Sequence, residues 1–186
     1  MAADQSERRR RFDALFEAYR EDIVAYCGWR TRSPSDAQDA VAEVFLAAWR
    51  RLDEIPEGDA ARVWLYATAR RAMANQRRSS RRRSALYERL AREPVAQEEP
   101  PNGDEALVRE ALLRLGARDR EVLLLAEWEG LSAAQIGRVV GCLTVTARGR
   151  LHRARRRFRA VFEELGGRSD ERTRHAFIAK EGHEHV

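Results

Sequence analysis

Apolar side chains recur at helical spacing throughout the chain, and this pattern predicts an all-α protein. Over residues 8–83 it forms three successive stripes, each wide enough to be the buried face of one helix. We therefore expect three helices packed on one another in this part of the chain. In chain order the stripes are Phe12, Leu15, Phe16, Tyr19, Ile23 and Tyr26, then Val41, Val44, Phe45, Ala48, Trp49 and Leu52, then Trp64, Leu65, Ala69, Ala72 and Met73.

Breaks in the pattern predict the helix boundaries of this first unit. Pro34 interrupts the pattern, and the S-x-x-Q spacing of Ser35 and Gln38 predicts a capping box that starts the second helix. Pro56 marks a loop, after which the third helix is expected to begin near Arg62.

A second helical unit is predicted over residues 106–165, and it ends in a helix-turn-helix. Two helical patterns divided by Gly116 come first. Ser132 and Gln135 then form another capping box, and Gly141 follows the last apolar position, where a left-handed turn requires a residue without Cβ. The residues expected to be buried in the two helices of the motif are Ala133, Ile136 and Val140, then Ala147, Leu151, Ala154 and Phe158, with Thr144 or Thr146 capping the second helix.

The composition changes between the two units. Residues 84–105 contain three prolines among acidic side chains, and no basic residue lies between Arg92 and Arg109. Such a stretch is typical of a flexible acidic linker. The predicted architecture is two small helical domains, residues 8–83 and 106–165, joined by this linker and followed by a polar tail over residues 166–186.

Positive charge is concentrated in two stretches of the 186-residue chain, whose net charge is +5. The second helix of the helix-turn-helix carries seven arginines, with no acidic residue between Glu129 and Glu163. The stretch from Ala60 to Tyr87 carries eight arginines and no acid. Both stretches predict DNA-binding surfaces. A solvated basic helix in a bundle would also explain the first stretch, and codon composition would explain why Lys180 is the only lysine.

Other classes of protein are disfavoured by what the sequence lacks. It shows no Gly-rich phosphate loop, no Ser/His/Asp grouping and no metal-ligand cluster, so we expect neither an enzyme nor a cofactor. Cys27 and Cys142 have no paired spacing, and His183 and His185 fit a solvated terminus better than a metal site. Because no apolar run approaches a membrane span or a signal peptide, a cytoplasmic protein is expected.

Two unlike motifs around a linker, in this order, resemble regions two and four of the bacterial extracytoplasmic function (ECF) sigma factors. The resemblance covers about residues 10–165. It implies an alternative sigma factor that binds core RNA polymerase, through the β′ clamp helices and the β flap, and directs promoter-specific initiation at minus-ten and minus-thirty-five elements. It also implies control by an anti-sigma factor, which is frequent in the family. The stretches that carry it are DAQDAVAEVFLAAWRRLDEIP, VWLYATARRAMANQRR, RLGARDREVLLLAEWEGLSAAQIGRVVG and RGRLHRARRRF.

The resemblance also implies roles for residues in the first unit. In the family, the second helix of region two docks on the polymerase clamp helices, and the loop and helix around Trp64 open the minus-ten element and capture an unstacked base. Unstacking costs only a few kcal/mol and requires stacking and hydrogen-bonding groups. Core packing would explain Phe45, Trp49 and Trp64 as well. The implied polymerase contacts are Asp39, Glu43, Phe45, Trp49 and Arg50, and the implied minus-ten contacts are Arg62, Trp64, Arg71, Asn75, Arg77 and Arg78.

In the second unit, the helix from Thr144 resembles the minus-thirty-five reader. An arginine that reads the O6 and N7 atoms of guanine contributes about 1–3 kcal/mol of discrimination. Four positions depart from the family pattern. In the first unit, Arg71 stands where the family commonly has asparagine. In the second unit, the family commonly has a proline at Ala117, a β-branched residue at Ala147 and a small polar residue at Gly149. The implied minus-thirty-five contacts are Thr144, Thr146, Arg148, Gly149, His152, Arg153 and Arg156.

The rival interpretation is a stand-alone helix-turn-helix regulator that never touches polymerase. Such a regulator would bind duplex DNA as a dimer, and the chain shows no clear dimerisation helix. A basic RNA-binding protein would be expected to carry aromatic-rich β-sheet platforms, whereas the periodicity here is helical.

Overall fold

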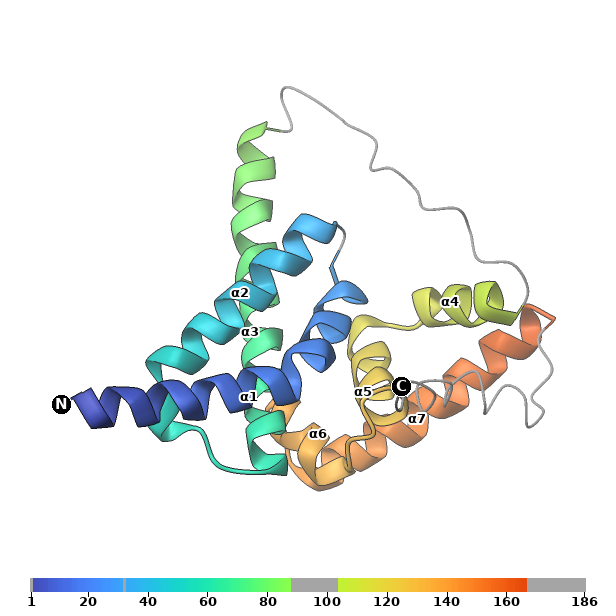
Figure 1. Cartoon of the computed structure of the whole chain (residues 1–186). Helices are drawn as coiled ribbons and strands as arrows, with labels where there is room; N and C mark the ends of the chain where they lie inside the picture. The colour runs from blue at the N-terminus through green and yellow to red at the C-terminus, as the bar shows by residue number, and fades with distance from the viewer. Residues whose placement is uncertain (1, 32, 88–103, 167–186) are drawn as a thin grey trace. The chain divides into compact units, whose positions relative to one another are not determined.

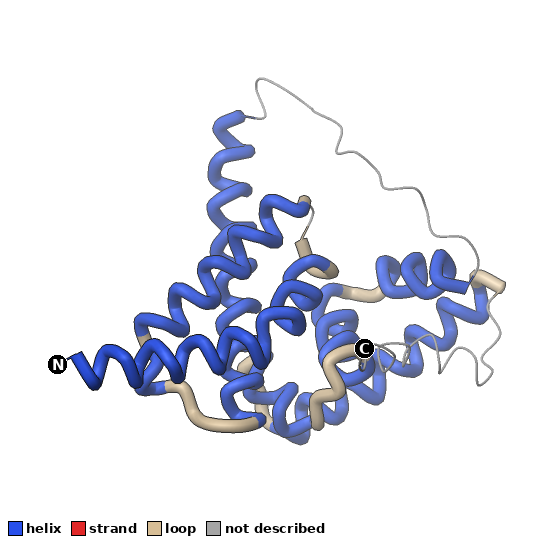
Figure 2. Tube along the Cα trace, viewed as in Figure 1, coloured by secondary structure: helices blue, strands red, loops and turns tan. Residues whose placement is uncertain are grey.

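The computed structural model describes residues 2–31, 33–87 and 104–166, and every regular element within them is a helix (Figures 1 and 2). This confirms the all-α prediction. The chain divides into two compact units, Met1–Val95 and Ala96–Val186. The predictions for the middle of the linker and for the tail, including His183 and His185, lie outside the described residues.

The first unit contains α1 (Ala2–Gly28), α2 (Pro34–Arg50), a 3₁₀ turn η1 (Leu52–Glu54) and α3 (Asp59–Tyr87). All three α-helices contact one another. Their shared core includes a pair of rings, Tyr26 and Tyr66, with centroids 4.9 Å apart and planes inclined at 54°. The buried members of the predicted stripes are Ile23, Tyr26, Val44, Phe45, Ala48, Leu52, Leu65, Ala69, Ala72 and Met73, while the remaining members are half-buried.

The predicted start of the second helix was wrong by two residues. Ser33, not Ser35, is the N-cap of α2, and its Oγ accepts a hydrogen bond from the Asp36 amide at 3.1 Å. Pro34 occupies the first turn because it has no N–H to satisfy and its φ is already helical. A proline that we had taken to end one element is therefore the beginning of the next.

Helix α3 is longer at both ends than predicted. It begins at Asp59 rather than near Arg62, and it continues to Tyr87, beyond the predicted linker start at residue 84. Neither glycine nor proline occurs between Gly58 and Pro94, so no local signal ends the helix at residue 83. Likewise α4 already includes residues 104 and 105, which we had assigned to the linker.

The second unit contains α4 (Asp104–Arg114), α5 (Ala117–Glu127), α6 (Ala133–Val140) and α7 (Thr144–Glu164). Helix α7 contacts each of the other three and so forms the centre of the unit. The end of α4 is fixed by Arg120, whose guanidinium donates to the carbonyls of Leu112, Leu113 and Leu115 at 2.6, 2.6 and 3.0 Å. These bonds add a donor to carbonyls in the last turn of α4 and just after it, where the helix itself supplies few partners.

The helix-turn-helix signals are confirmed at its first helix. The Ser132 amide donates to Oε1 of Gln135 at 2.8 Å, and the Gln135 amide donates to Ser132 Oγ at 3.3 Å, which completes the capping box. Gly141 ends α6 in the left-handed region, with φ +74°. The prediction that Val140 is buried was wrong: Val139 is buried instead, and Val140 is half-buried, as is Ala133. From Ile136, spacings of three and four residues are both helical, so periodicity cannot choose between adjacent valines.

The predicted stripe of α7 is confirmed. Ala147, Leu151, Ala154 and Phe158 are all buried, and Phe162 continues the stripe by one turn. The connection into this helix is tight at Gly137, whose carbonyl accepts the Cys142 amide at 2.8 Å. A Cβ at Gly137 would lie 2.8 Å from the Cys142 carbonyl oxygen, so this position needs glycine.

We expect Gly137→Ala to lower the free energy of unfolding by about 1–3 kcal/mol, because the added methyl meets backbone atoms that cannot move independently. Alanine is otherwise the better helix former, so a loss here reports the close approach alone. Gly149→Ala is the matched control: its Cβ would meet only Nη1 of Arg153, at 3.5 Å. In this control the free energy of unfolding, measured by thermal or urea unfolding, should rise by about 0.5–1 kcal/mol. Equal effects of the two substitutions would contradict the steric account.

Candidate nucleic-acid interface

The outward face of α7 lies opposite its buried stripe. Arg148, His152 and Arg156 follow one another at intervals of four residues, and all three are exposed. Arg153 is exposed beside them, and Gly149 lies between Arg148 and His152 on the same face. The structure thus brings together the non-threonine members of the predicted minus-thirty-five set.

The first turn of α7 differs from the prediction. Its N-cap is Leu143, which provides no side-chain hydrogen bond, and neither Thr144 nor Thr146 acts as the cap. Both threonines already lie inside the helix, so their hydroxyls do not occupy the position from which a cap reaches the N2 or N3 amide. Thr144 is exposed and Thr146 half-buried. The amides of this turn therefore have no side-chain cap, and the positive end of the helix faces outward with them.

Ion pairs divide the arginines of α7 into two groups. Arg155 pairs with Glu127 at 2.7 Å, and Arg157 pairs with Asp119, so both fasten α7 to α5. Within the part of the chain that the structure describes, Arg148, Arg153 and Arg156 form no ion pair. The outward face therefore carries positive charge that no nearby carboxylate compensates.

Four of the six predicted minus-ten residues share one face of α3. Trp64, Arg71, Asn75 and Arg78 follow at spacings of seven, four and three residues, which places them along one side of the helix. Arg71, Asn75 and Arg78 are exposed, and Trp64 is half-buried. The face is cross-linked by hydrogen bonds from Arg71 Nη2 to Thr68 Oγ1, at 3.2 Å, and from Arg78 to the Asn75 side chain.

The other two predicted residues hold the unit together. Nε of Arg62 lies 3.2 Å from the carboxylate of Asp22 on α1, on the side of α3 opposite Trp64. Nη2 of Arg77 donates to the Arg30 carbonyl at 2.7 Å. The sequence did not reveal these partners, because each lies more than 35 residues away in the chain.

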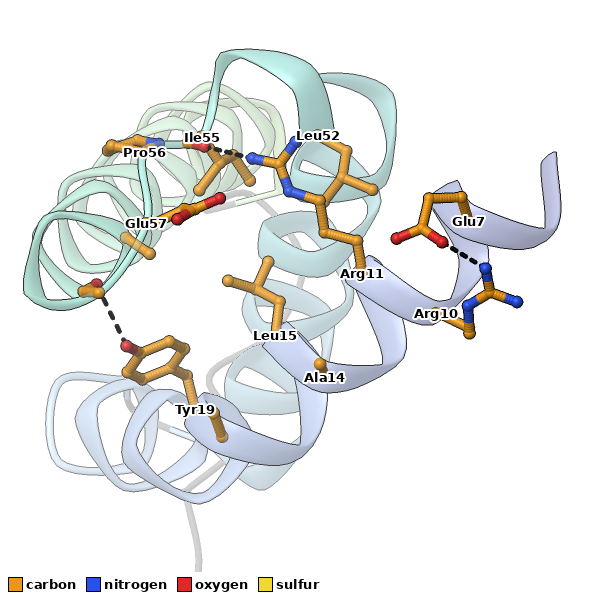
Figure 3. A pocket seen from close by; sticks show the side chains of 13 residues that line it. Glu7, Arg10, Arg11, Ala14, Leu15, Tyr19, Leu52, Ile55, Pro56 and Glu57 are labelled. Atoms are coloured by element: carbon orange, nitrogen blue, oxygen red, sulfur yellow. Dashed lines mark hydrogen bonds and ion pairs between the residues drawn. The ribbon is translucent and has the colours of Figure 1, made fainter. Parts of the chain in front are cut away.

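Side chains of α1 brace the loop that precedes α3, and sequence reasoning missed them. Arg11 Nη2 donates to the Ile55 carbonyl at 2.8 Å, and the Tyr19 hydroxyl donates to the Gly58 carbonyl at 3.2 Å (Figure 3). Arg8 donates to the Trp49 carbonyl at 2.7 Å and pairs with Asp53 at 2.6 Å. An open groove of about 600 Å³ between α1 and the loop is lined by Arg11, Tyr19, Ile55 and Gly58, among others. Side chains outside α3 therefore hold the loop that precedes the predicted minus-ten face of this helix.

The predicted polymerase contacts on α2 fall into two classes. Asp39, Glu43 and Arg50 are exposed on one face, and Leu46, which the sequence analysis missed, lies among them and is 49% exposed. Phe45 instead belongs to the core: it is 5% exposed, and its ring centroid lies 4.7 Å from that of Phe16.

Trp49 lies at the edge of this core and is half-buried. It meets Phe12 edge-to-face at 5.2 Å, and the Arg8 guanidinium lies over its ring, 5.4 Å from the centroid. Both aromatic rings of α2 thus attach the helix to α1, and the exposed face of Asp39, Glu43, Leu46 and Arg50 lies on another side of the helix.

Neither metal chemistry nor a membrane span is indicated by the described residues. They include no group of three or more His, Cys, Asp or Glu side chains suited to a metal ion, and both cysteines are free thiols. No helix among them is both long and apolar enough to cross a membrane.

Comparison with known proteins finds both motifs in one family. Residues 15–83 match the model of sigma-70 region 2, and residues 105–158 match that of sigma-70 region 4. The ECF RNA polymerase sigma factor SigL of Mycobacterium tuberculosis is 32% identical over 160 residues, covering 82% of this chain and 89% of SigL. The RNA polymerase sigma-E factor of Streptomyces coelicolor is 28% identical over 170 residues, covering 88% of this chain and 89% of that protein.

Two solved structures share the fold. The sigma factor RpoE of Bartonella quintana, in complex with the anti-sigma factor NepR, superposes with a TM-score of 0.68 at 23% identity, covering 82% of this chain and 96% of RpoE. CnrH, in complex with the cytosolic domain of CnrY, gives a TM-score of 0.60 at 22% identity, covering 84% of this chain and 90% of CnrH.

The brace from α1 leads to a local prediction. In Arg8→Gln plus Arg11→Gln, we expect amide hydrogen exchange of residues 52–61 to accelerate, because the loop loses its hydrogen bonds to two charged donors. Each such bond contributes about 1.5–3 kcal/mol. Mass spectrometry of peptides from both units provides the measurement, and peptides of the second unit should be unchanged. Arg9→Gln is the control, since among the described residues Arg9 pairs with Asp13 alone, at 4.0 Å. A loop that exchanges equally in both variants would contradict the brace.

Proposed function

The chain belongs to the ECF RNA polymerase sigma factors, and from this membership we propose how its exposed faces divide the steps of promoter recognition. As an alternative sigma factor it binds core RNA polymerase and directs initiation at specific promoters. Members of the family are regulatory proteins rather than enzymes. The observation that carries the assignment of faces is that α3 and α7 each carry exposed arginines on a face that lies outside the core of their unit.

In this proposal α7 reads the minus-thirty-five element in the major groove. Arg148 and Arg153 supply guanidinium groups for base edges or phosphates, and His152 and Arg156 extend the contact along the helix. The uncapped first turn of α7, including Thr144 and Thr146, adds backbone amides and the positive helix end for a phosphate.

The exposed face of α3 opens the minus-ten element in this proposal. Trp64 supplies an aromatic edge, Asn75 supplies donor and acceptor groups for an unstacked base, and Arg71 and Arg78 attract the backbone. Arg62 and Arg77, which were also implied by the resemblance, act indirectly: Arg62 fixes α3 to α1, and Arg77 fixes α3 to the loop that follows α1. Because Arg71 stands where the family commonly has asparagine, the captured base would meet a guanidinium group there in place of an amide.

The exposed face of α2 docks on the β′ clamp helices, with Asp39, Glu43 and Arg50 around Leu46. Phe45 and Trp49 position this face through their packing on α1. A contact of the second unit with the β flap follows from the family role of region four. The working boundaries of the two functional units are residues 8–83 and 106–165.

We further propose regulation by an anti-sigma factor, because the RpoE structure is a complex with an anti-sigma factor. Such a partner would compete for the exposed faces of α2 and α7. Since core polymerase works in the cytoplasm, the chain is proposed to act there.

Run-off transcription on fragmented DNA from a GC-rich bacterium tests the assignment of α7. We expect core polymerase with this protein to produce discrete start sites that core polymerase alone does not. Arg148→Ala plus Arg153→Ala should reduce them at least tenfold, because each lost guanidinium contact removes about 1–3 kcal/mol. Arg109→Ala plus Arg118→Ala removes the same charge from exposed positions of α4 and α5 and should retain the start sites. Equal losses in both variants would contradict the assignment of α7.

Core-polymerase affinity tests the face of α2. We expect Leu46→Ala and Glu43→Lys each to weaken binding about tenfold, equivalent to about 1.4 kcal/mol, since one removes apolar contact and the other reverses a charge. Glu17→Lys is the control, because Glu17 is exposed on α1 and its substitution makes the same change of charge elsewhere in the unit. Titration of fluorescently labelled protein with core polymerase supplies the measurement. Wild-type affinity in both α2 variants would exclude this face.

A further inference from the structure

Two large aliphatic side chains are exposed where α7 begins. Leu143 is 74% exposed and Val145 is 70% exposed, the two highest values among the exposed large hydrophobic residues of the described chain. Single exposed aliphatics are ordinary on protein surfaces. Val145 differs because of its position, which is in the first turn of the helix and on the same face as Arg148.

Helical spacing places Val145 within the reading face rather than the core. Arg148, Gly149 and His152 follow it at intervals of three, four and seven residues. The buried stripe starts at Ala147, on the other side of the helix, so Val145 contributes nothing to the core. Its two methyl groups therefore face the same partner as the uncompensated arginine.

The major groove offers one apolar group to such a side chain. Among base edges there, thymine alone carries a C5-methyl group, and the N-terminal residues of a recognition helix are those that reach base edges. We propose that Val145 is a specificity-determining residue that packs on a thymine methyl of the minus-thirty-five element. This inference rests on the proposed function of α7.

Spacing along the helix locates that thymine relative to Arg148. Three residues of α-helix advance by about 4.5 Å, close to the separation of about 3.4 Å between neighbouring base pairs. The thymine is therefore expected on a base pair next to the one that Arg148 contacts. Gly149 adds no side chain between them, and a Cβ there would meet only the flexible Arg153 guanidinium, so the groove edge can approach Val145 and Arg148 together.

Replacement of thymine by deoxyuridine tests the contact, because the two bases differ by the methyl group alone. Duplex promoters obtained from the run-off experiment carry single deoxyuridines in the minus-thirty-five element, and holoenzyme affinity is measured for each. We expect one position where loss of the methyl weakens binding about threefold to fivefold. In Val145→Ala, natural and deoxyuridine duplexes should bind equally at that position.

Three further variants separate this contact from other causes. Val145→Thr keeps the shape of the side chain and should retain only part of the methyl dependence. Arg148→Ala should weaken binding to every duplex and keep that dependence. Val24→Ala, at an exposed position of α1, should change neither property. Because Val145 is exposed, its truncation leaves no core cavity, and thermal unfolding checks that the fold is kept.

The outcomes distinguish this inference from the proposed function. If wild-type affinity is indifferent to every deoxyuridine, or if the dependence persists in Val145→Ala, the contact is overturned. Loss of affinity in Arg148→Ala on those same duplexes would still support α7 as the reader. If neither substitution affects binding, the assignment of α7 to the minus-thirty-five element fails as well.

Discussion

The second unit depends on an arginine-rich helix, α7, which is held by its apolar stripe and by two paired arginines while its remaining arginines stay exposed or half-buried. Seven arginines within α7 repel one another, so intrinsic helix stability is a poor foundation for it. Burial of its apolar stripe compensates, and the stripe ends in the stacked rings of Phe158 and Phe162, 5.8 Å apart. Arg155 and Arg157 then fasten α7 to α5 through Glu127 and Asp119, whose side chains are 26% and 13% exposed. Together these contacts fix the rotation of the helix about its own axis.

The first unit applies the same division of labour to α3. Arg62 pairs with Asp22, and Arg77 donates to the Arg30 carbonyl. Arg71 and Arg78 remain on the exposed face. In both units, therefore, arginine serves to attach a helix as well as to present charge. Which role a given arginine takes depends on what the fold places opposite it.

This dependence explains what could and could not be predicted from sequence. The helices, the helix-turn-helix and the buried stripe of α7 follow from periodicity and from short-range capping signals. The capping box of Ser132 and Gln135 is such a signal, since it lies within four consecutive residues. The error at Val140 arose because two adjacent valines satisfy the same helical spacing from Ile136. The error at Ser35 arose because a serine stands on either side of Pro34, and both are residue types that cap helices. Arg62 and Trp64 differ in role, as do Arg157 and Arg156, because Arg62 and Arg157 have ion-pair partners. Those partners, Asp22 and Asp119, lie 40 and 38 residues away in the chain, so no local pattern reveals them.

The fixed rotation of α7 also limits how this chain can be specific. In the proposed assignment the reading face includes Gly149, where no side chain is available, so fewer groups would touch bases than on a helix with polar residues throughout. A single unit with this face would bind weakly. Joining it to a second DNA-binding unit makes the second contact intramolecular, which raises overall affinity by about 10²–10⁴ without any new contact. A reading face with few base contacts on α7 is therefore compatible with selective initiation. Promoter choice requires both elements, so the binding free energy of each unit adds to that of the other.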